Sequence, residues 1–405
     1  MNNREKRAGI PSMMVTQLTE SATLAMARKS RELQQQGIAV VSLSLGEPDF
    51  NTPEFIKEAA VQAMKDNITH YPPVNGLADV RRAIAHKLKR DNELTYSPEE
   101  ILVSTGAKQC IANAILSLVD EGDEVIMPSP YWVSYAEIVK MVGGVVVEVP
   151  AGVENDYKIT AEQLQSAITD KTRLIIYSSP CNPTGSVYSK EELQSFASVI
   201  LKYPGLYIIS DEIYELIHFG DRPVSMAAME GMWERTITVN GVSKAFAMTG
   251  WRIGYLAAPK WITDACNKMQ GQVTSGANSI AQMAAKAAVE ADPSVVADMV
   301  KTFRHRRDLV FDLLKDVPNI KINLPEGAFY FFPDIRYYLG KQYNGKRMDT
   351  AQDLCIYLLQ EHRLALVTGE AFGDPNCIRI SYATSDEVLK EAMLRFKNGL
   401  AALQD

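Results

Sequence analysis

The chain has 405 residues, of which 46% are apolar, so it is long enough for about two or three domains and has the composition of a folded globular protein. Its formal net charge of −7 argues against a nucleic-acid-binding surface, and we expect no nucleic-acid partner. No run of roughly 18 apolar residues occurs and no apolar stretch follows the charged start, so we expect no membrane span, no signal peptide and a cytoplasmic location.

The N-terminal part of the chain predicts helices joined by short extended segments. Helical spacing predicts a helix over 21–33 that Gly37 ends, and alternation predicts a short strand over 40–45 that runs into a turn at Gly46. We expect two amphipathic helices next, over 54–66 and 78–90. Between them, two prolines stiffen a loop over 71–76.

From residue 101 onward, apolar strands alternate with helices. We predict strands over 101–105, 124–127, 145–149, 174–177, 206–209 and 236–239, with helices over 106–119, 160–168 and 190–202. The strands are almost continuously apolar, as strands covered on both faces are. The pattern therefore indicates an α/β fold with a mostly parallel central sheet covered by helices.

Beyond about residue 290 the pattern changes. Helices over 295–315 and 350–362, a strand over 378–382 and a closing helix from Ser385 indicate a smaller α+β domain that packs with the N-terminal segment. We therefore predict a large domain over 47–290 and a small domain made of 1–46 and 291–405.

Polar residues follow the ends of four predicted strands. They are Gly106-Ala107 at a helix start, Asn182 in an Asn-Pro-Thr-Gly turn, Asp211 with Tyr214, and Ser243 with Lys244. Each has an ordinary structural explanation as a turn or a helix cap. In an open parallel sheet, however, ligands bind outside the carboxyl ends of the strands, so the joint occurrence indicates one site.

The chemistry of this set fits one kind of ligand. Lys244 lies among apolar neighbours, where desolvation favours the neutral, nucleophilic amine that an imine requires. The helix start, Ser243 and Arg252 can hold a phosphate. Asp211 can hold the proton of a ring nitrogen, and the pairing of such an acid with an imine-forming lysine is typical of pyridoxal 5′-phosphate. Asn182 and Tyr214 can donate to its ring oxygen. Trp132 can stack on the ring, although at this position a core tryptophan is equally expected.

Four segments carry a resemblance to a known family: Ser243-Lys-Ala-Phe-Ala-Met-Thr-Gly-Trp-Arg252, Asn182-Pro-Thr-Gly185, Ser210-Asp-Glu-Ile-Tyr214 and Ile378-Arg-Ile-Ser-Tyr382. They resemble the class I aminotransferases of pyridoxal-phosphate fold type I. Within that class the chain is most similar to the bacterial aspartate aminotransferases of the prokaryotic subgroup, some of which also use prephenate. The resemblance implies transamination of L-aspartate with 2-oxoglutarate to give oxaloacetate and L-glutamate.

The resemblance also implies roles for individual residues. Lys244, Asp211 and Tyr214 would be catalytic, with Lys244 bonded to the cofactor and moving the substrate proton. The cofactor-binding set would be Gly106, Ala107, Lys108, Trp132, Asn182, Asp211, Tyr214, Ser243, Lys244 and Arg252, with Tyr71 reaching the phosphate bound by the neighbouring subunit of a homodimer. The substrate-binding set would be Gly46, Trp132, Asn182, Arg379, Lys108, Ser21 and Thr23, in which Arg379 takes the α-carboxylate and Lys108 the distal one. A solvated Lys108 at a helix start is the plain alternative.

Other functions fit the sequence less well. No Gly-x-Gly-x-x-Gly follows a strand, which disfavours a nicotinamide dehydrogenase, and Gly340–Arg347 lacks the Ser or Thr that a phosphate-binding loop needs for magnesium. The five cysteines have no CxxC spacing, so neither a disulfide framework nor a zinc site is indicated. A prephenate or aromatic aminotransferase and a pyridoxal-phosphate-dependent β-lyase remain alternatives within the fold. A non-catalytic sensor would call for an N-terminal helix-turn-helix, which the sequence does not predict.

Overall fold

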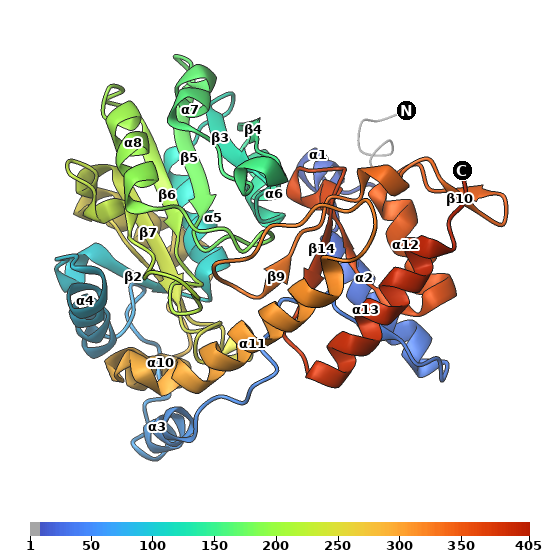
Figure 1. The fold of residues 1–405 in the computed structure, drawn as a ribbon. Coiled ribbons are helices and arrows are strands. Elements are labelled where there is room, and N and C mark those ends of the chain that lie inside the picture. Colours follow the sequence, from blue (N-terminus) through green and yellow to red (C-terminus); the bar gives the residue numbers. More distant parts are fainter. Residues whose placement is uncertain (1–8) are drawn as a thin grey trace.

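The structure is a computed structural model and describes residues 9–405 (Figure 1). Its centre is a seven-stranded sheet whose strands lie in the order β2 (Ile101–Ser104), β8 (Gly254–Ala257), β7 (Thr236–Gly241), β6 (Tyr207–Asp211), β5 (Thr172–Ser178), β3 (Glu124–Ser129) and β4 (Val145–Pro150). Every pairing is parallel except the two that β8 makes with β2 and β7, which are antiparallel. The predicted mostly parallel sheet is therefore confirmed, and β8 is an addition to it.

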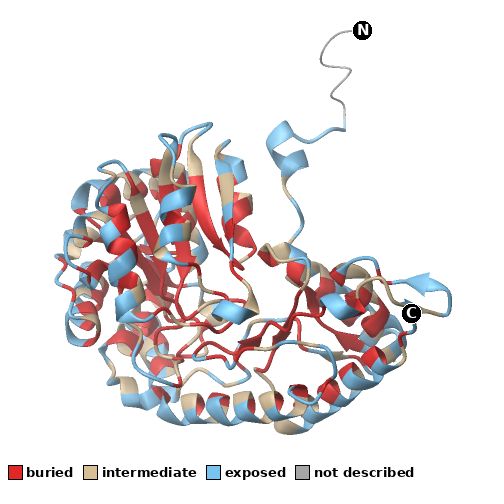
Figure 2. Cartoon of the chain, turned by 45° about the horizontal axis from the view of Figure 1, so that its top comes forward, coloured by how far each residue is buried: buried red, intermediate tan, exposed pale blue. Residues whose placement is uncertain are grey.

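Helices cover both faces of this sheet, as the apolar strands require. They are α4 (Ala78–Asn92), α5 (Ala107–Leu118), α6 (Ser134–Met141), α7 (Ala161–Ala167), α8 (Lys190–Ile200), α9 (Lys260–Val273) and α10 (Ser279–Glu290). Helix α3 (Glu54–Lys65) packs against α10, farther from the strands (Figure 1). Side chains alternate along a strand, so Leu102 packs in the cluster of α5 and α9, whereas Ile101 and Val103 pack in the cluster of α4 and α10. Figure 2 shows the buried residues concentrated in the strands, with the outer helix faces exposed.

The N-terminal segment and the C-terminal part of the chain lie together at one side of the sheet (Figure 1). They contribute α1 (Met13–Gln17), α2 (Ala22–Gln35), β1 (Val41–Ser42), α11 (Ala297–Leu314), β9 (Tyr330–Phe331), β10 (Gln342–Tyr343), β11 (Lys346–Arg347), α12 (Ala351–His362), β12 (Leu364–Ala365), β13 (Val367–Thr368), β14 (Ile378–Ser381) and α13 (Asp386–Ala401). The parallel pairing of β1 with β12 joins the two parts of the chain. A three-stranded antiparallel sheet has the order β13-β14-β9.

The domain bounds predicted above are 47–290 for the large domain and 1–46 with 291–405 for the small one. The bounds themselves stay a prediction, and the first eight residues of the range 1–46 lie outside the described residues. The strand predicted over 40–45 is shorter than expected, because only Val41 and Ser42 find a ladder partner. Gly340–Arg347 lies in the exposed hairpin of β10 and β11. Among residues 9–405, no helix is both long and apolar enough to span a membrane.

Candidate active site

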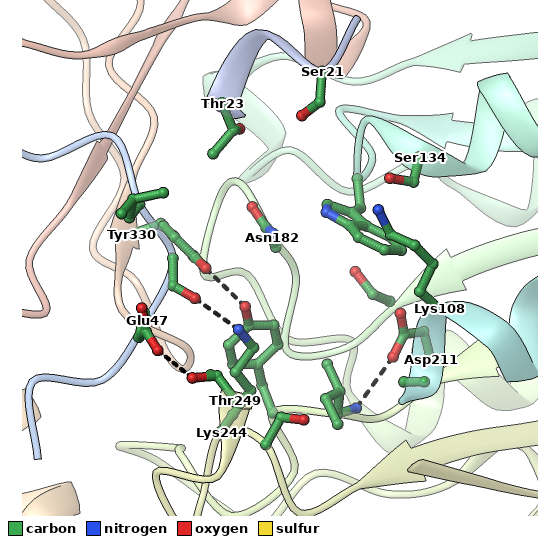
Figure 3. A pocket seen from close by; sticks show the side chains of 18 of the residues that line it. Ser21, Thr23, Glu47, Lys108, Ser134, Asn182, Asp211, Lys244, Thr249 and Tyr330 are labelled. Carbon is green, nitrogen blue, oxygen red and sulfur yellow. Dashed lines mark hydrogen bonds between the residues drawn. The ribbon is translucent and has the colours of Figure 1, made fainter. Parts of the chain in front are cut away.

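The loops that follow the carboxyl ends of the strands meet around one cavity of about 450 Å³ (Figure 3). Of the site residues predicted from the sequence, all but Gly106 and Tyr71 line it. The cavity lies between the large sheet and the smaller C-terminal part, because β14 and β9 contribute Arg379 and Tyr330 to its wall. The structure therefore brings together residues that are widely separated in the sequence.

Lys244 lies just beyond the end of β7, with its amine in an apolar setting. Its Nζ donates to the Gly46 carbonyl at 2.6 Å and lies 5.8 Å from the ring centre of Tyr214 and 6.0 Å from that of Phe329. Burial, together with the positive charge of Arg379, lowers the pKa of Lys244 to about 8. About one amine in ten is therefore neutral at pH 7, far more than at the ordinary lysine pKa, and the neutral form is the one that acts as a nucleophile or a base.

Asp211 ends β6 as a buried carboxylate whose two oxygens are both held. Oδ2 accepts from the Tyr135 hydroxyl at 2.6 Å, and Oδ1 accepts from the Ile213 amide at 3.2 Å. Burial raises the pKa of Asp211 to about 6, although both hydrogen bonds lower it. No cation forms an ion pair with it within residues 9–405. A buried carboxyl group of this kind suits a ligand that brings a cationic N–H.

One end of the cavity is a cradle for an anion. Gly106 caps α5 with φ +84°, and a Cβ there would lie 2.6 Å from Nη2 of Arg252. A Cβ on Gly254 would lie 2.3 Å from the amide nitrogen of Ala107, so glycine keeps β8 against the start of the helix. Ala107 begins α5, where the amides have no intrahelical acceptor, and the Ser243 hydroxyl lines the same cavity. This donor set matches a phosphate group.

Arg379 on β14 forms the opposite end. It is 2% exposed; Nη1 donates to Oδ1 of Asn182 at 2.9 Å, Nη2 donates to the Ser44 carbonyl at 2.6 Å, and Nε has no partner among the described residues. Burial lowers the pKa of Arg379. Because the Asn182 carbonyl oxygen accepts from Arg379, its amide N–H₂ remains available to donate elsewhere. A planar guanidinium with an unpaired donor suits a carboxylate.

The wall near α2 and α6 carries a second cation. The Nζ of Lys108 lies 5.0 Å from the ring centre of Trp132. Partial desolvation lowers the pKa of Lys108, and the positive charge of Arg252 lowers it further. Ser21 and Thr23 line the same cavity, on the α2 side of the view in Figure 3. Lys108, Ser21 and Thr23, the residues that the resemblance assigns to the distal carboxylate, thus line one cavity, and their role stays a prediction.

Tyr71 does not reach this cavity in its own chain. Its side chain is 98% exposed, which is unusual for a tyrosine. Its predicted partner is the phosphate bound by another subunit, so the structure of one chain is compatible with the prediction but does not test it.

Sequence reasoning missed several residues of the site. Tyr135 holds Asp211 and packs edge-on against Trp132, with ring centres 5.4 Å apart. Tyr330 bonds to Tyr214, and Glu47 accepts from the Thr249 hydroxyl. Their signals were weak: Tyr135 lies in the first turn of α6, three residues after Trp132, and Tyr330 lies in an aromatic run that is typical of a core.

The residues around the cavity match the chemical groups of pyridoxal phosphate. The buried carboxyl of Asp211, which has no ion-pair partner among the described residues, fits the ring nitrogen, and the anion cradle at the start of α5 fits the phosphate. Lys244, with its lowered pKa, fits the aldehyde, and the free donor of Arg379 fits the carboxylate of a bound amino acid. The sheet and this cavity define a pyridoxal-phosphate-dependent enzyme of fold type I.

Comparison with known proteins gives the family. Residues 38–396 match the family described as aminotransferase class I and II, and the chain belongs to it. It is 46% identical, over 97% of its length and 83% of the relative, to a bifunctional aspartate aminotransferase and glutamate/aspartate-prephenate aminotransferase of Petunia hybrida. It is 43% identical to an aspartate/prephenate aminotransferase of Nitrosomonas europaea, over 96% of this chain and 99% of that protein.

Solved structures agree. The crystal structure of the aspartate aminotransferase from Rhizobium meliloti superposes with a TM-score of 0.93 at 40% identity, covering 97% of this chain and 99% of that one. The aspartate aminotransferase from Thermus thermophilus with maleate gives a TM-score of 0.90 at 40% identity, over 96% of this chain and 99% of that one. The protein is therefore an aminotransferase that uses pyridoxal phosphate, as the sequence predicted.

Proposed function

We propose that the protein transfers the amino group of L-aspartate to 2-oxoglutarate, giving oxaloacetate and L-glutamate. The observation that carries this choice of substrate is that two cationic side chains, Arg379 and Lys108, line the cavity that also contains the amine of Lys244. A dicarboxylic amino acid has one carboxylate for each of them. The names of the relatives, aspartate aminotransferase and aspartate/prephenate aminotransferase, support the proposal.

Bound pyridoxal phosphate supplies the electron sink that lets the substrate Cα lose a proton. Arg379 binds the α-carboxylate through its guanidinium and so orients the Cα–H bond. The Lys244 amine, whose lowered pKa makes its neutral form easier to reach, then accepts the Cα proton as general base. With the cofactor bound, Asp211 would hold a proton on the ring nitrogen, and the Asn182 amide and the Tyr214 hydroxyl would donate to the ring oxygen. Trp132 and Tyr135 exclude water from one side of the cavity.

Prephenate is a second candidate substrate. It is a larger dicarboxylic acid with a ring, so it needs apolar contacts at the mouth of the cavity. Leu24 and Leu45 line the cavity with 57% and 40% of their surface exposed, which provides such contacts. Relatives named aspartate/prephenate aminotransferase at 43% identity support this candidate.

Replacement of Lys108 tests the choice of substrate. We expect Lys108→Ala to lower kcat/KM for aspartate by about 10²-fold, because the distal carboxylate loses its cation, and kcat/KM for alanine by less than about threefold. The measurement is a panel of amino donors with 2-oxoglutarate, with prephenate as an alternative acceptor. Lys190→Ala, an exposed lysine on α8, is the matched control. Equal losses for aspartate and alanine would contradict the proposed role of Lys108.

We also propose that the protein acts as a homodimer with shared active sites, in the cytoplasm. The support is the exposed tyrosine at position 71 and three exposed apolar side chains on the preceding helix α3: Phe55, Val61 and Met64 are 37%, 44% and 48% exposed. A partner subunit that packs on this part of the chain would cover them. A second copy of the chain would bring Tyr71 to the anion cradle.

Mixing two inactive variants tests the shared sites. Each proposed site takes Lys244 from one chain and Tyr71 from the other. A mixed dimer of Lys244→Ala and Tyr71→Ala therefore has one site in which both residues are present. We expect equal mixing after reversible dissociation to restore about one quarter of wild-type activity. Mixing Lys244→Ala with Asp211→Ala, both in the same chain's site, is the control and should restore nothing. No restoration in the mixture of Lys244→Ala and Tyr71→Ala would overturn the assignment of Tyr71 to the partner's site.

A further inference from the structure

Tyr330 is a buried residue that no predicted role uses, yet it contacts several groups of the site. It lies on β9, 1% exposed, and its ring hydroxyl is 2.7 Å from the hydroxyl of Tyr214. Its ring lies under the guanidinium of Arg379, with the Arg379 Cζ 4.7 Å from the ring centre. Figure 3 shows Tyr330 reaching from the smaller part of the protein toward Lys244.

The strand pairing of the small sheet explains the second contact. Tyr330 stands opposite Ser381 in the antiparallel ladder of β9 and β14. Arg379 is two residues before Ser381, so it lies on the same face and diagonal to Tyr330, within reach of a long side chain. The backbone therefore fixes the stacking of Arg379 on this ring.

Gly46 makes room for the hydroxyl of Tyr330. A Cβ on Gly46 would lie 2.0 Å from that oxygen, so any other residue there would displace it. The Gly46 carbonyl also accepts from Lys244. The hydroxyl is thus confined between the backbone at Gly46 and the hydroxyl of Tyr214, and within residues 9–405 Tyr214 is its one hydrogen-bond partner.

Proton counting then fixes the direction of this hydrogen bond in the working enzyme. Each phenol has one proton. If Tyr214 donates its proton to the cofactor's ring oxygen, it can only accept from Tyr330, which must be the donor. The chain Tyr330 to Tyr214 to ring oxygen is then cooperative, since each bond polarises the next.

We propose that Tyr330 is a positioning residue that keeps Tyr214 a donor toward the cofactor's ring oxygen while its ring supports Arg379 at the substrate carboxylate. The inference rests on the proposed function, in which Tyr214 and Arg379 have these roles. It makes one side chain of the small sheet responsible for both the cofactor end and the substrate end of the site.

A double-mutant cycle of Tyr330 and Tyr214 tests the proposed hydrogen bond from Tyr330 to Tyr214. The readout is the pH midpoint of the visible absorption band of the holoprotein, together with the dissociation constant of pyridoxal phosphate. Loss of a donor leaves the ring oxygen more basic, so Tyr214→Phe should raise the midpoint by about one pH unit, a tenfold change in proton affinity, and Tyr330→Phe should raise it by about half a unit. Tyr330→Phe in the Tyr214→Phe background should add nothing.

Tyr382→Phe is the matched control. It removes the hydroxyl of another fully buried tyrosine beside the same sheet, one that donates to the Ala328 carbonyl at 3.2 Å and does not line the cavity. It should leave the midpoint unchanged. An additive double variant, or no shift in Tyr330→Phe, overturns the inference.

The affinity for maleate, a dicarboxylate, tests whether the ring of Tyr330 supports Arg379. Tyr330→Phe keeps the aromatic ring under Arg379, so maleate should bind within about twofold of wild type, whereas Tyr330→Leu should weaken binding by about fivefold or more. Equal affinities in both variants overturn the support of Arg379. Covalent trapping of pyridoxal phosphate on Lys244, measured in every variant, distinguishes failure of this inference from failure of the proposed function. Trapping without the expected changes in pH midpoint and maleate affinity refutes only the inference about Tyr330. No trapping in the wild type refutes the proposed function.

Discussion

Lys244→Ala is expected to lose transaminase activity by at least about 10⁴-fold, because one side chain both binds the cofactor aldehyde and takes the substrate proton. The structure supplies the reasons. The amine is held at the Gly46 carbonyl inside the cavity, and burial lowers its pKa to about 8. The visible absorption band of the purified protein should also disappear from the variant after dialysis. Steady-state rates and absorbance spectra check both expectations.

The control for this variant is Lys260→Ala. Lys260 begins α9 and forms an exposed ion pair with Asp264, away from the cavity. It should keep wild-type activity and the visible band. Activity of Lys244→Ala within about tenfold of wild type would mean that another group performs the proton transfer.

Asp211→Asn is expected to lower kcat/KM by about 10³-fold, since a charged partner of the ring nitrogen is replaced by a neutral one in a buried site. Asparagine has nearly the same shape, so the Tyr135 side chain keeps its packing against Trp132. The loss should appear with every amino donor, unlike the loss in Lys108→Ala. A loss confined to dicarboxylic donors would show that Asp211 acts on the substrate and not on the cofactor.

Although Asp211→Asn is expected to lower activity, it should raise the free energy of unfolding of the cofactor-free protein. Burial raises the pKa of Asp211 from 3.8 to about 6, so the folded chain binds this proton more tightly than the unfolded chain. A raised carboxyl pKa costs stability as the pH rises above the unfolded value, and the cost is complete above about pH 6. We therefore expect Asp211→Asn apoprotein to be more stable by about 1–2 kcal/mol at neutral pH, with the gain vanishing below about pH 4.

Thermal unfolding of both apoproteins across this pH range checks the sign. A gain that grows as the pH falls would mean that the carboxylate is stabilised, not strained, in the folded protein. Added pyridoxal phosphate should reverse the order of stability, because the cofactor binds the wild type more tightly and so stabilises it more.

The central sheet could be predicted because its strands carry their own signal. Runs such as Ile101–Ser104 and Thr236–Val239 are apolar and β-branched, and each ends at a turn. β8 was missed because Gly254–Ala257 begins only two residues after Arg252, with no turn signal between them to separate a strand from the loop. Its antiparallel position depends on two neighbours that lie far away in the sequence.

The residues of the site likewise differ in whether a local sequence pattern identifies them. Lys244, Asp211 and Asn182 follow strand ends, so a rule about parallel sheets groups them without coordinates. Tyr135 and Tyr330 owe their roles to contacts that span 76 and 116 residues of sequence, with Asp211 and Tyr214 respectively. No local pattern encodes such a contact. Tyr71 is a third case, since its predicted partner lies on another chain.

The most direct measurement is reduction of the holoprotein with sodium borohydride, followed by digestion and mass spectrometry of the labelled peptide. If the loops around this cavity bind one pyridoxal phosphate, the label will be found on Lys244 alone and in a ratio of one per chain. A label on Lys108 or another lysine, or no label at all, would contradict the account.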